Sequence, residues 1–356
     1  MSDPIPETMQ RVVLAARPQG EPKESDFRLE TVPMPQPREG EFLARTIWLS
    51  LDPYMRGRMD DSKSYAAAVE LGAPMEGGCV GEVIASNHPK FKVGDYVEDR
   101  FGWQSHAVSG GQGVRKLDPN AAPLSTALGV LGMPGITAYA GLNIHGRPKQ
   151  GETLVVGAAT GAVGSLVGQL AKAQGLRVVG VAGGAEKCSF AMEELGFDAC
   201  LDHRAVDGDA SALRKQIAAQ CSDGVDIYFE NVGGLILDAV VPLMNVHGRI
   251  PVCGMISWYN AGSLGGGIVD GPNQLPRVWR TILVNRLSVQ GFIITDHYDQ
   301  FPKFISDVAP MIADGRVKYR ESVSEGLASA PQAFMNLLKG GNFGKQLVAV
   351  SHDPTR

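Results

Sequence analysis

Residues 154–172 read LVVGAATGAVGSLVGQLAK. Three apolar residues favour a buried strand, small residues favour a tight turn, and apolar residues at helical spacing follow from Val163. In a strand–turn–helix unit of this kind, the amino terminus of the helix presents free N–H groups and a partial positive charge to a phosphate. The stretch therefore predicts a phosphate-binding turn. Other residues of the chain indicate which molecule carries the phosphate.

The turn departs from the G-x-G-x-x-G dinucleotide fingerprint at its first position, which is Ala159. Gly161 still allows the backbone to approach a pyrophosphate, and Gly164 still allows the helix to pack closely on the strand. The motif alone leaves open a tight turn without a ligand, but the strands and helices around it favour a dinucleotide. The turn residues expected to contact the cofactor are Thr160, Gly161, Ala162, Val163 and Gly164.

The chain changes character near residue 128. Residues 1–127 contain short apolar or alternating runs broken by Pro and Gly, which predict a β-barrel, and a late strand near 345–351 is expected to rejoin it. Beyond residue 128, strands alternate with helices, a pattern typical of a doubly wound parallel sheet. We predict an α/β fold with a barrel domain over 1–127 and 297–356 and a Rossmann domain over 128–296.

The end of the next predicted strand indicates which nicotinamide cofactor is bound. An NAD site needs an Asp or Glu about 20 residues beyond the turn, for the ribose 2′-hydroxyl. Here the strand ends in Ala182 and Gly183, and Lys187, His203 and Arg204 follow. Basic groups in place of the acid suit a 2′-phosphate, so NADPH/NADP⁺ is expected. The alternative is that Lys187 is only a solvated residue of a first helical turn.

Composition excludes several classes of function. The net charge of −5 argues against a nucleic-acid partner, and no apolar run is long enough to span a membrane. The amino-terminal residues do not resemble a signal peptide. Five dispersed cysteines without a CxxC pair predict reduced thiols and a cytoplasmic location.

A barrel ahead of a Rossmann domain resembles the medium-chain dehydrogenase/reductase superfamily, many members of which hold zinc through Cys and His. A zinc alcohol dehydrogenase would carry a cysteine near WLSLDPYMRG, where this chain has Ser50, Leu51 and Asp52. His88 and His106 have no ligand partner at a useful spacing. We therefore expect no metal. Hydride attack on an activated C=C bond then fits, because its negative charge spreads into an enolate.

Six motifs occur in order and together cover essentially the whole chain. They are WLSLDPYMRGRM (48–59), LGMPGITAYAGL (131–142), AATGAVGS (158–165), ENVGG (230–234), GRIPVCGMISWYN (248–260) and LLKGGNFGKQLV (337–348). They resemble the zinc-independent prostaglandin and alkenal reductases, and in particular the bacterial NADPH-dependent curcumin reductases. The resemblance implies a GroES-like barrel, NADPH-dependent reduction of the C=C bond of small α,β-unsaturated ketones and aldehydes, and a homodimer joined through SVQGFII at 288–294.

The resemblance also implies site residues in a cleft between the domains. Tyr259 is expected to hydrogen-bond the substrate carbonyl and steady the enolate, with hydride passing to the β-carbon. Tyr54 and Arg56 are expected in the substrate pocket, although both tyrosines could be structural. His203 departs from the family, which often has tyrosine there. The further residues expected near the cofactor are Met133, Thr137, Asn231, Cys253, Gly254, Phe292, Ile293, Ile294 and Asn342.

Two other functions are compatible with the same residues. A quinone reductase would use the same cofactor and fold, and a non-catalytic NADPH sensor would bind cofactor without consuming it. The glycine-rich residues 261–278 predict a mobile loop that sets substrate choice.

Overall fold

The computed structural model describes residues 4–267 and 275–355, which divide into two compact units. Unit 1 comprises residues 1–129, 259–267 and 321–356, and unit 2 comprises residues 130–258 and 268–320. Among the helices of the described ranges, none combines the length and apolarity needed to cross a bilayer.

Unit 1 is built on β-sheets. Its small sheet pairs β1 (Thr8–Leu14) antiparallel with β2 (Phe27–Pro33). The larger sheet has the order β14-β15-β3-β4-β5-β7, and β6 also pairs with β3. Its strands are β3 (Phe42–Ser50), β4 (Cys79–Ser86), β5 (Tyr96–Asp99), β6 (His106–Ser109), β7 (Arg115–Leu117), β14 (Glu321–Glu325) and β15 (Lys345–Ala349).

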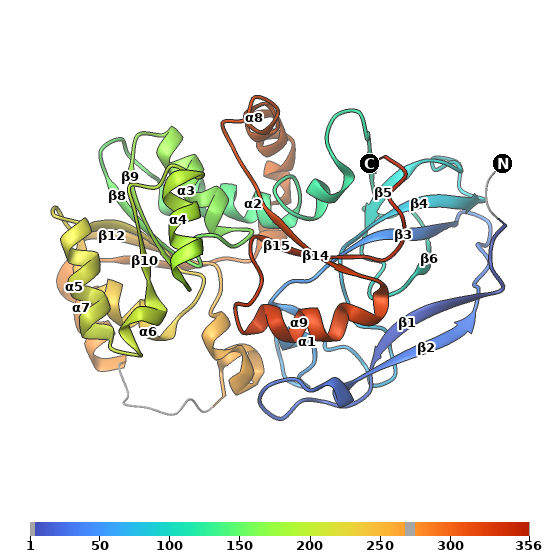
Figure 1. The fold of residues 1–356 in the computed structure, drawn as a ribbon, viewed down its shortest axis with the longest axis horizontal. Helices are drawn as coiled ribbons and strands as arrows, with labels where there is room; N and C mark the ends of the chain where they lie inside the picture. The colour runs from blue at the N-terminus through green and yellow to red at the C-terminus, as the bar shows by residue number, and fades with distance from the viewer. Residues whose placement is uncertain (1–3, 268–274, 356) are drawn as a thin grey trace. The chain divides into compact units, whose positions relative to one another are not determined.

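The end of the chain completes unit 1, as predicted. β15 pairs antiparallel with β3, with Leu347 opposite Ser50, and Figure 1 shows this red strand beside the blue one. α9 (Ala330–Leu338) adds Phe334 to the core, where its ring meets Trp103 edge-on at 5.7 Å. The short α1 (Met55–Arg58) follows β3.

Unit 2 contains the parallel sheet that the alternating pattern predicts. Its order is β10-β9-β8-β11-β12-β13, and every pair in it is parallel. The central strands are almost wholly apolar because helices cover a parallel sheet on both faces. The strands are β8 (Thr153–Gly157), β9 (Arg177–Ala182), β10 (Ala199–Asp202), β11 (Val225–Phe229), β12 (Met244–Val252) and β13 (Ser288–Gly291).

Helices connect these strands, with α3 and α4 packed on β8–β10 and α7 on β12. The order of strands places β8 at the point where the connections change direction, which is where such sheets bind ligands. The helices of unit 2 are α2 (Met133–Ala140), α3 (Gly164–Ala173), α4 (Ala185–Glu193), α5 (Ala210–Gln220), α6 (Gly234–Val240), α7 (Leu275–Asn285) and α8 (Phe301–Ala313).

The observed units differ from the predicted domain limits at three places. Residues 297–320, which we predicted with the barrel, lie in unit 2, and residues 128–129 and 259–267, which we predicted with the Rossmann domain, lie in unit 1. Packing explains the first difference, because Phe304 of α8 is fully buried and its ring lies 5.8 Å from that of Tyr139 on α2. The Tyr139 hydroxyl also donates to Asp307 at 2.6 Å.

Candidate functional site

The turn after β8 accommodates its unusual alanine through a glycine on the neighbouring strand. Ala159 is fully buried, and a Cβ on Gly180 of β9 would lie only 2.8 Å from the Ala159 methyl group. The missing side chain of Gly180 therefore leaves room for Ala159. Gly164 is more constrained, because a Cβ there would lie 2.4 Å from the carbonyl oxygen of Ala158. The close approach of helix and strand that the motif predicts is thus present.

We expect Gly164→Ala to open this turn, because the added methyl group has no room beside the Ala158 carbonyl. Overpacking of this kind costs about 1–3 kcal/mol of folding free energy. Urea unfolding should show that loss, and the Kd for NADPH should rise. Gly110→Ala is the matched control, since nothing lies within 4 Å of its added methyl group. Equal stability of both variants would contradict the packing argument.

Basic side chains gather where β9 and β10 end. A Cβ on Gly183 would lie 2.9 Å from Nε of Arg204 and 3.0 Å from Nε2 of His203, so both side chains lie beside this glycine. Asp202 fixes the arrangement by accepting from the backbone N–H of Gly184 at 2.8 Å and of Arg204 at 2.9 Å. These N–H groups lower the pKa of Asp202 against the opposing effect of burial.

The cations in this cluster influence one another. Burial, and then the charge of Arg204, lower the pKa of Lys187. Burial and Arg204 likewise lower the pKa of His203, with a smaller contribution from Lys187. Lys187, His203 and Arg204 therefore form a basic cluster, in which Lys187 and Arg204 carry the charge and His203 is a hydrogen-bonding imidazole. Such a cluster is suited to a phosphate dianion, whose charge would relieve the mutual repulsion.

The lowered pKa of His203 predicts a pH effect on folding. The folded protein favours neutral His203, so this stabilising contribution is present above about pH 6.5 and is lost as pH falls toward and through the folded pKa. His203→Gln should therefore lose less stability than the wild type between pH 7 and pH 5. Urea midpoints at several pH values measure this, with the exposed His352→Gln as control. Identical pH profiles for wild type and His203→Gln would refute it.

A buried carboxylate organises the loop after β11. Glu230 is 3% exposed and accepts from the backbone N–H groups of Val232 at 2.6 Å and Gly233 at 2.9 Å. Its other oxygen accepts from the Tyr228 hydroxyl at 2.9 Å. Burial raises the pKa of Glu230 even though these donors favour its anion. The carboxylate thus holds the turn that carries Asn231.

The same loop brings further predicted cofactor residues together. Asn231 donates from Nδ2 to the carbonyl of Gly157 at 2.9 Å, at the end of β8. The backbone N–H groups of Cys253 and Gly254 both donate to the carbonyl of Glu230, at 2.9 and 3.2 Å. Burial raises the pKa of Cys253 to about 12, which agrees with our view of it as a packing residue rather than a nucleophile.

The other predicted cofactor residues of unit 2 lie on α2 and after β13. Thr137 is buried and donates to the carbonyl of Met133 at 2.7 Å, so the two share one face of the helix. Phe292 is buried too, and its ring stacks on His145 at 4.9 Å. That ring packs into the unit, whereas Ile293 and Ile294 are half-buried.

Unit 1 carries the two predicted substrate tyrosines. Tyr259 is 8% exposed and lies in the 3₁₀ turn Ile256–Ala261. Tyr54 immediately precedes α1, and the segment Ser263–Gly265 that follows Tyr259 packs against that helix. Burial, and then the charge of Asp52, raise the pKa of Tyr54, so its phenol stays protonated. Unit 1 therefore brings these two segments side by side.

Arg56 lies inside unit 1, where its contacts are with protein groups. Its side chain is fully buried, pairs with Asp60 at 2.6 Å and donates to the carbonyl of Gly20 at 2.9 Å. Arg58, which the sequence did not single out, lies over the rings of Tyr65 at 4.4 Å and Tyr54 at 5.7 Å. These contacts tie Arg56 to the segment that carries Tyr54, and its place in the substrate pocket stays a prediction.

A buried lysine ties the Tyr54 segment to the Asn342 segment. Lys345 donates from Nζ to the carbonyl of Leu51 and to the carboxylate of Asp52, both at 2.7 Å. Ser50 hydrogen-bonds the second oxygen of the same carboxylate. Asn342 lies three residues before Lys345 and donates to the carbonyl of Gly344 at 2.7 Å. Burial lowers the pKa of Lys345, and Asp52 opposes this effect.

Comparison with known proteins identifies the family. Residues 10–117 match a model described as the N-terminal domain of oxidoreductase, and residues 162–309 match one described as zinc-binding dehydrogenase. The chain is 50% identical over 344 residues to NADPH-dependent curcumin reductase of Escherichia coli, covering 96% of this chain and 97% of that one. It is 40% identical over 348 residues to 2-alkenal reductase of Nicotiana tabacum, covering 96% and 98%. The chain belongs to the zinc-independent medium-chain dehydrogenase/reductase family.

A solved structure supports both this membership and the fold. CurA of Vibrio vulnificus in complex with NADPH is 48% identical, covers 97% of this chain and 100% of its own, and superposes with a TM-score of 0.91. The predicted α/β class, with a barrel-like domain and a Rossmann domain, is therefore confirmed. Within residues 4–267 and 275–355, no three or more His, Cys, Asp or Glu side chains gather closely enough to hold a metal ion.

The sequence reasoning missed several residues that shape these segments. We assigned no role to Glu230 of the ENVGG motif. A charged residue directly after an apolar strand is a signal that could have marked it as a residue that holds the following turn. Asp52 and Lys345 lie 293 residues apart, so only the fold pairs them. The predicted loop over 261–278 ends earlier than expected, because residues 275–278 form the first turn of α7, and residues 268–274 lie outside the described residues.

Proposed function

We propose that this protein reduces the C=C bond of α,β-unsaturated ketones and aldehydes, with NADPH as its cofactor. The observation that carries the proposal is 50% identity over 96% of the chain to an NADPH-dependent curcumin reductase. Other relatives of nearly full length are named 2-alkenal reductase and (+)-pulegone reductase. The chain is accordingly an NADPH-dependent oxidoreductase, and the residue roles below are our inferences.

The residues of unit 2 are suited to binding and orienting the cofactor. The turn at Thr160–Gly164 would receive the pyrophosphate at the amino terminus of α3. Lys187, His203 and Arg204 would receive the 2′-phosphate, since His203 and Arg204 lie beside Gly183 and the charge of Lys187 interacts with that of Arg204. Glu230 would keep the Asn231 turn in place. When bound, NADPH supplies the hydride that the β-carbon of the substrate accepts.

Tyr259 is the residue that we assign to the substrate. Its phenol would donate a hydrogen bond to the substrate oxygen, where negative charge develops as the enolate forms. Tyr54 is the second tyrosine proposed for the pocket, and its buried phenol remains a neutral donor because its pKa is raised. Asn342 is proposed as a further cofactor residue, on the segment that Lys345 anchors.

The loss of absorbance of reduced nicotinamide tests this function directly. NADPH and NADH should be compared in parallel against a linear enone, a saturated ketone and a simple quinone. We expect rapid NADPH consumption with the enone, little with the ketone and slower turnover with NADH. Faster turnover of the quinone would favour a quinone reductase, and no consumption with any acceptor would favour an NADPH-binding sensor.

We also propose a homodimer joined through β13. This strand ends the sheet of unit 2, all four of its residues are exposed, and an exposed edge strand readily pairs with another chain. Val289→Lys should shift the protein toward the monomer in size-exclusion chromatography with light scattering, because charge on an edge opposes pairing. Val246→Lys, at another exposed valine, is the control. A dimer unchanged by Val289→Lys would exclude this edge.

A cytoplasmic location is proposed from the thiols. All five cysteines are free, and a reducing compartment maintains unpaired thiols.

A further inference from the structure

A small basic cavity lies at the amino-terminal end of the parallel sheet in unit 2. It has a volume of about 260 Å³ and is lined by Arg147, Lys149, His247, Arg249 and Ser288. None of the five lining residues is acidic, although the whole chain carries a net charge of −5. Lys149 precedes β8 and Ser288 begins β13, so the cavity lies at the opposite end of the sheet from the Thr160–Gly164 turn.

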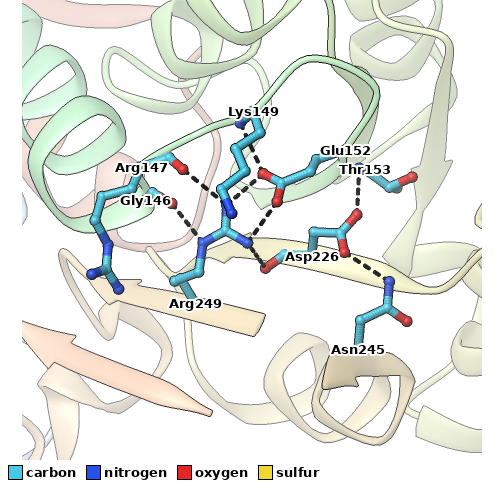
Figure 2. Close-up of polar contacts among 8 residues, drawn as sticks. All are labelled: Gly146, Arg147, Lys149, Glu152, Thr153, Asp226, Asn245 and Arg249. Carbon is cyan, nitrogen blue, oxygen red and sulfur yellow. Dashed lines mark hydrogen bonds and ion pairs between the residues drawn. The ribbon is translucent and has the colours of Figure 1, made fainter. Parts of the chain in front are cut away.

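Arg249 is one of the residues that line this cavity, and it organises the residues around it. Its side chain is buried, and Figure 2 shows its guanidinium in the centre of a set of polar contacts. It forms a two-pronged pair with the carboxylate of Glu152 and donates from Nε to the carbonyl of Gly146 at 2.8 Å. It also donates to the carbonyl of Arg147 at 3.0 Å. The N–H donors of Arg249 all bind protein acceptors, so none is directed to a ligand. Arg249 is therefore a positioning residue.

The same network holds the other cations at the cavity. Glu152 accepts from the backbone N–H of Lys149 at 2.9 Å, so one carboxylate fixes both Arg249 and the Lys149 segment. In Figure 2 the Arg147 side chain runs away from Glu152, and its guanidinium meets none of the residues drawn. The charge of Glu152 is thus directed to Arg249, while the guanidinium of Arg147 points elsewhere.

An irregularity in β12 places His247 at the cavity, and β13 places Ser288 there. The pairing of β11 with β12 shifts between Val225–Met244 and Ile227–Arg249, which places three extra residues on β12. His247 lies in this bulge with a φ of 64°, and it is exposed. Ser288 lies directly opposite Arg249 in the register of β12 and β13. Bulges commonly re-aim a side chain, and here the bulge brings an imidazole to the cavity.

We propose that this cavity binds a phosphate group, either as the free ion or as a small phosphomonoester. Arg147 and Lys149 would supply the charge, His247 and the Ser288 hydroxyl would supply further hydrogen bonds, and Arg249 would hold the frame. Guanidinium and ammonium groups beside a hydroxyl are the usual donors to phosphate oxygens. The site is separate from the Lys187–His203–Arg204 cluster and goes beyond the proposed reductase function.

Titration of the full-length protein with inorganic phosphate tests the proposal, by calorimetry at constant ionic strength with chloride as the balancing ion. Arg147→Asn with Lys149→Gln is the informative variant, because asparagine tolerates the left-handed backbone of Arg147, whose φ is 47°. We expect saturable binding by the wild type and affinity at least about tenfold weaker in the double variant. Unfolding midpoints should agree, because neither exchanged side chain is part of the Arg249 network.

Two matched double variants separate this site from other charges. Lys187→Gln with Arg204→Gln removes the proposed cofactor cations, and Lys63→Gln with Lys90→Gln removes two positive charges from unit 1. Binding to the cavity should persist in both variants with an affinity within about twofold of the wild type, and any second binding event that only the Lys187/Arg204 variant loses belongs to the cofactor cluster. Phenyl phosphate binding more tightly than inorganic phosphate would assign an ester, and the reverse would assign the free ion. Equal affinity of wild type and the Arg147/Lys149 variant, or no saturable binding by the wild type, would overturn the proposal.

Discussion

Tyr259→Phe is expected to lower kcat for enone reduction by about 100-fold, the usual cost of removing a hydrogen-bond donor to a developing oxyanion. The side chain is 8% exposed, and phenylalanine keeps its ring, so the loss of folding stability should not exceed about 1.5 kcal/mol. The Kd for NADPH should stay within about twofold, because the residues that we assign to the cofactor phosphates are elsewhere. Stopped-flow reduction of an enone and fluorescence titration of NADPH measure the two effects.

Tyr298→Phe provides the control for this experiment. Tyr298 is 39% exposed and has no role in the proposed mechanism, so the kcat of the Tyr298→Phe variant should match that of the wild type. Unchanged kcat in Tyr259→Phe would remove Tyr259 from the mechanism and leave the cofactor assignment intact. Equal loss of kcat and of NADPH affinity would instead indicate a structural role.

Lys187→Gln combined with Arg204→Gln is expected to raise the KM for NADPH on the order of 100-fold. Each hydrogen bond to a charged group contributes about 1.5–3 kcal/mol, and this variant removes two cations from beside the proposed 2′-phosphate. The KM for NADH should change little, because NADH lacks that phosphate. The ratio of the two KM values is therefore the decisive readout, since a general loss of folding would raise both.

Lys215→Gln with Arg280→Gln is the matched control for the cofactor prediction. It removes the same charge from unit 2 at residues outside the cluster of Lys187, His203 and Arg204. We expect an unchanged preference for NADPH in this variant. A fall in preference equal to that of the Lys187/Arg204 variant would mean that overall charge, rather than these side chains, selects the cofactor.

Local patterns made the fold and the turn after β8 predictable. The order of strand, small residues and helix at 154–172 fixes a βα turn because each signal is short-range. Gly183, His203 and Arg204 were also predictable together, since the ends of adjacent parallel strands meet at one edge of a sheet. The gathering of these side chains beside Gly183 needed no more information than strand order.

The remaining features depend on packing between distant segments. Sequence alone gives no sign that Gly180 makes room for Ala159, because the two approach each other only in the paired strands. The assignment of α8 to the wrong side of a domain limit has the same origin, since its burial depends on Tyr139 of α2. Arg249 and Glu152 lie 97 residues apart, and polar residues inside predicted strands give no indication of their partners.

The pairing of β15 with β3 has a consequence for synthesis of the protein. Ribosomes add roughly 5–20 residues per second, so Lys345 emerges tens of seconds after Asp52, its partner 293 residues earlier. During that interval β3 lacks its partner strand β15, and the carboxylate of Asp52 lacks the ammonium group of Lys345. We therefore expect unit 2 to become resistant to proteases first during translation. Unit 1 should become resistant later, although its first residues are synthesised earlier.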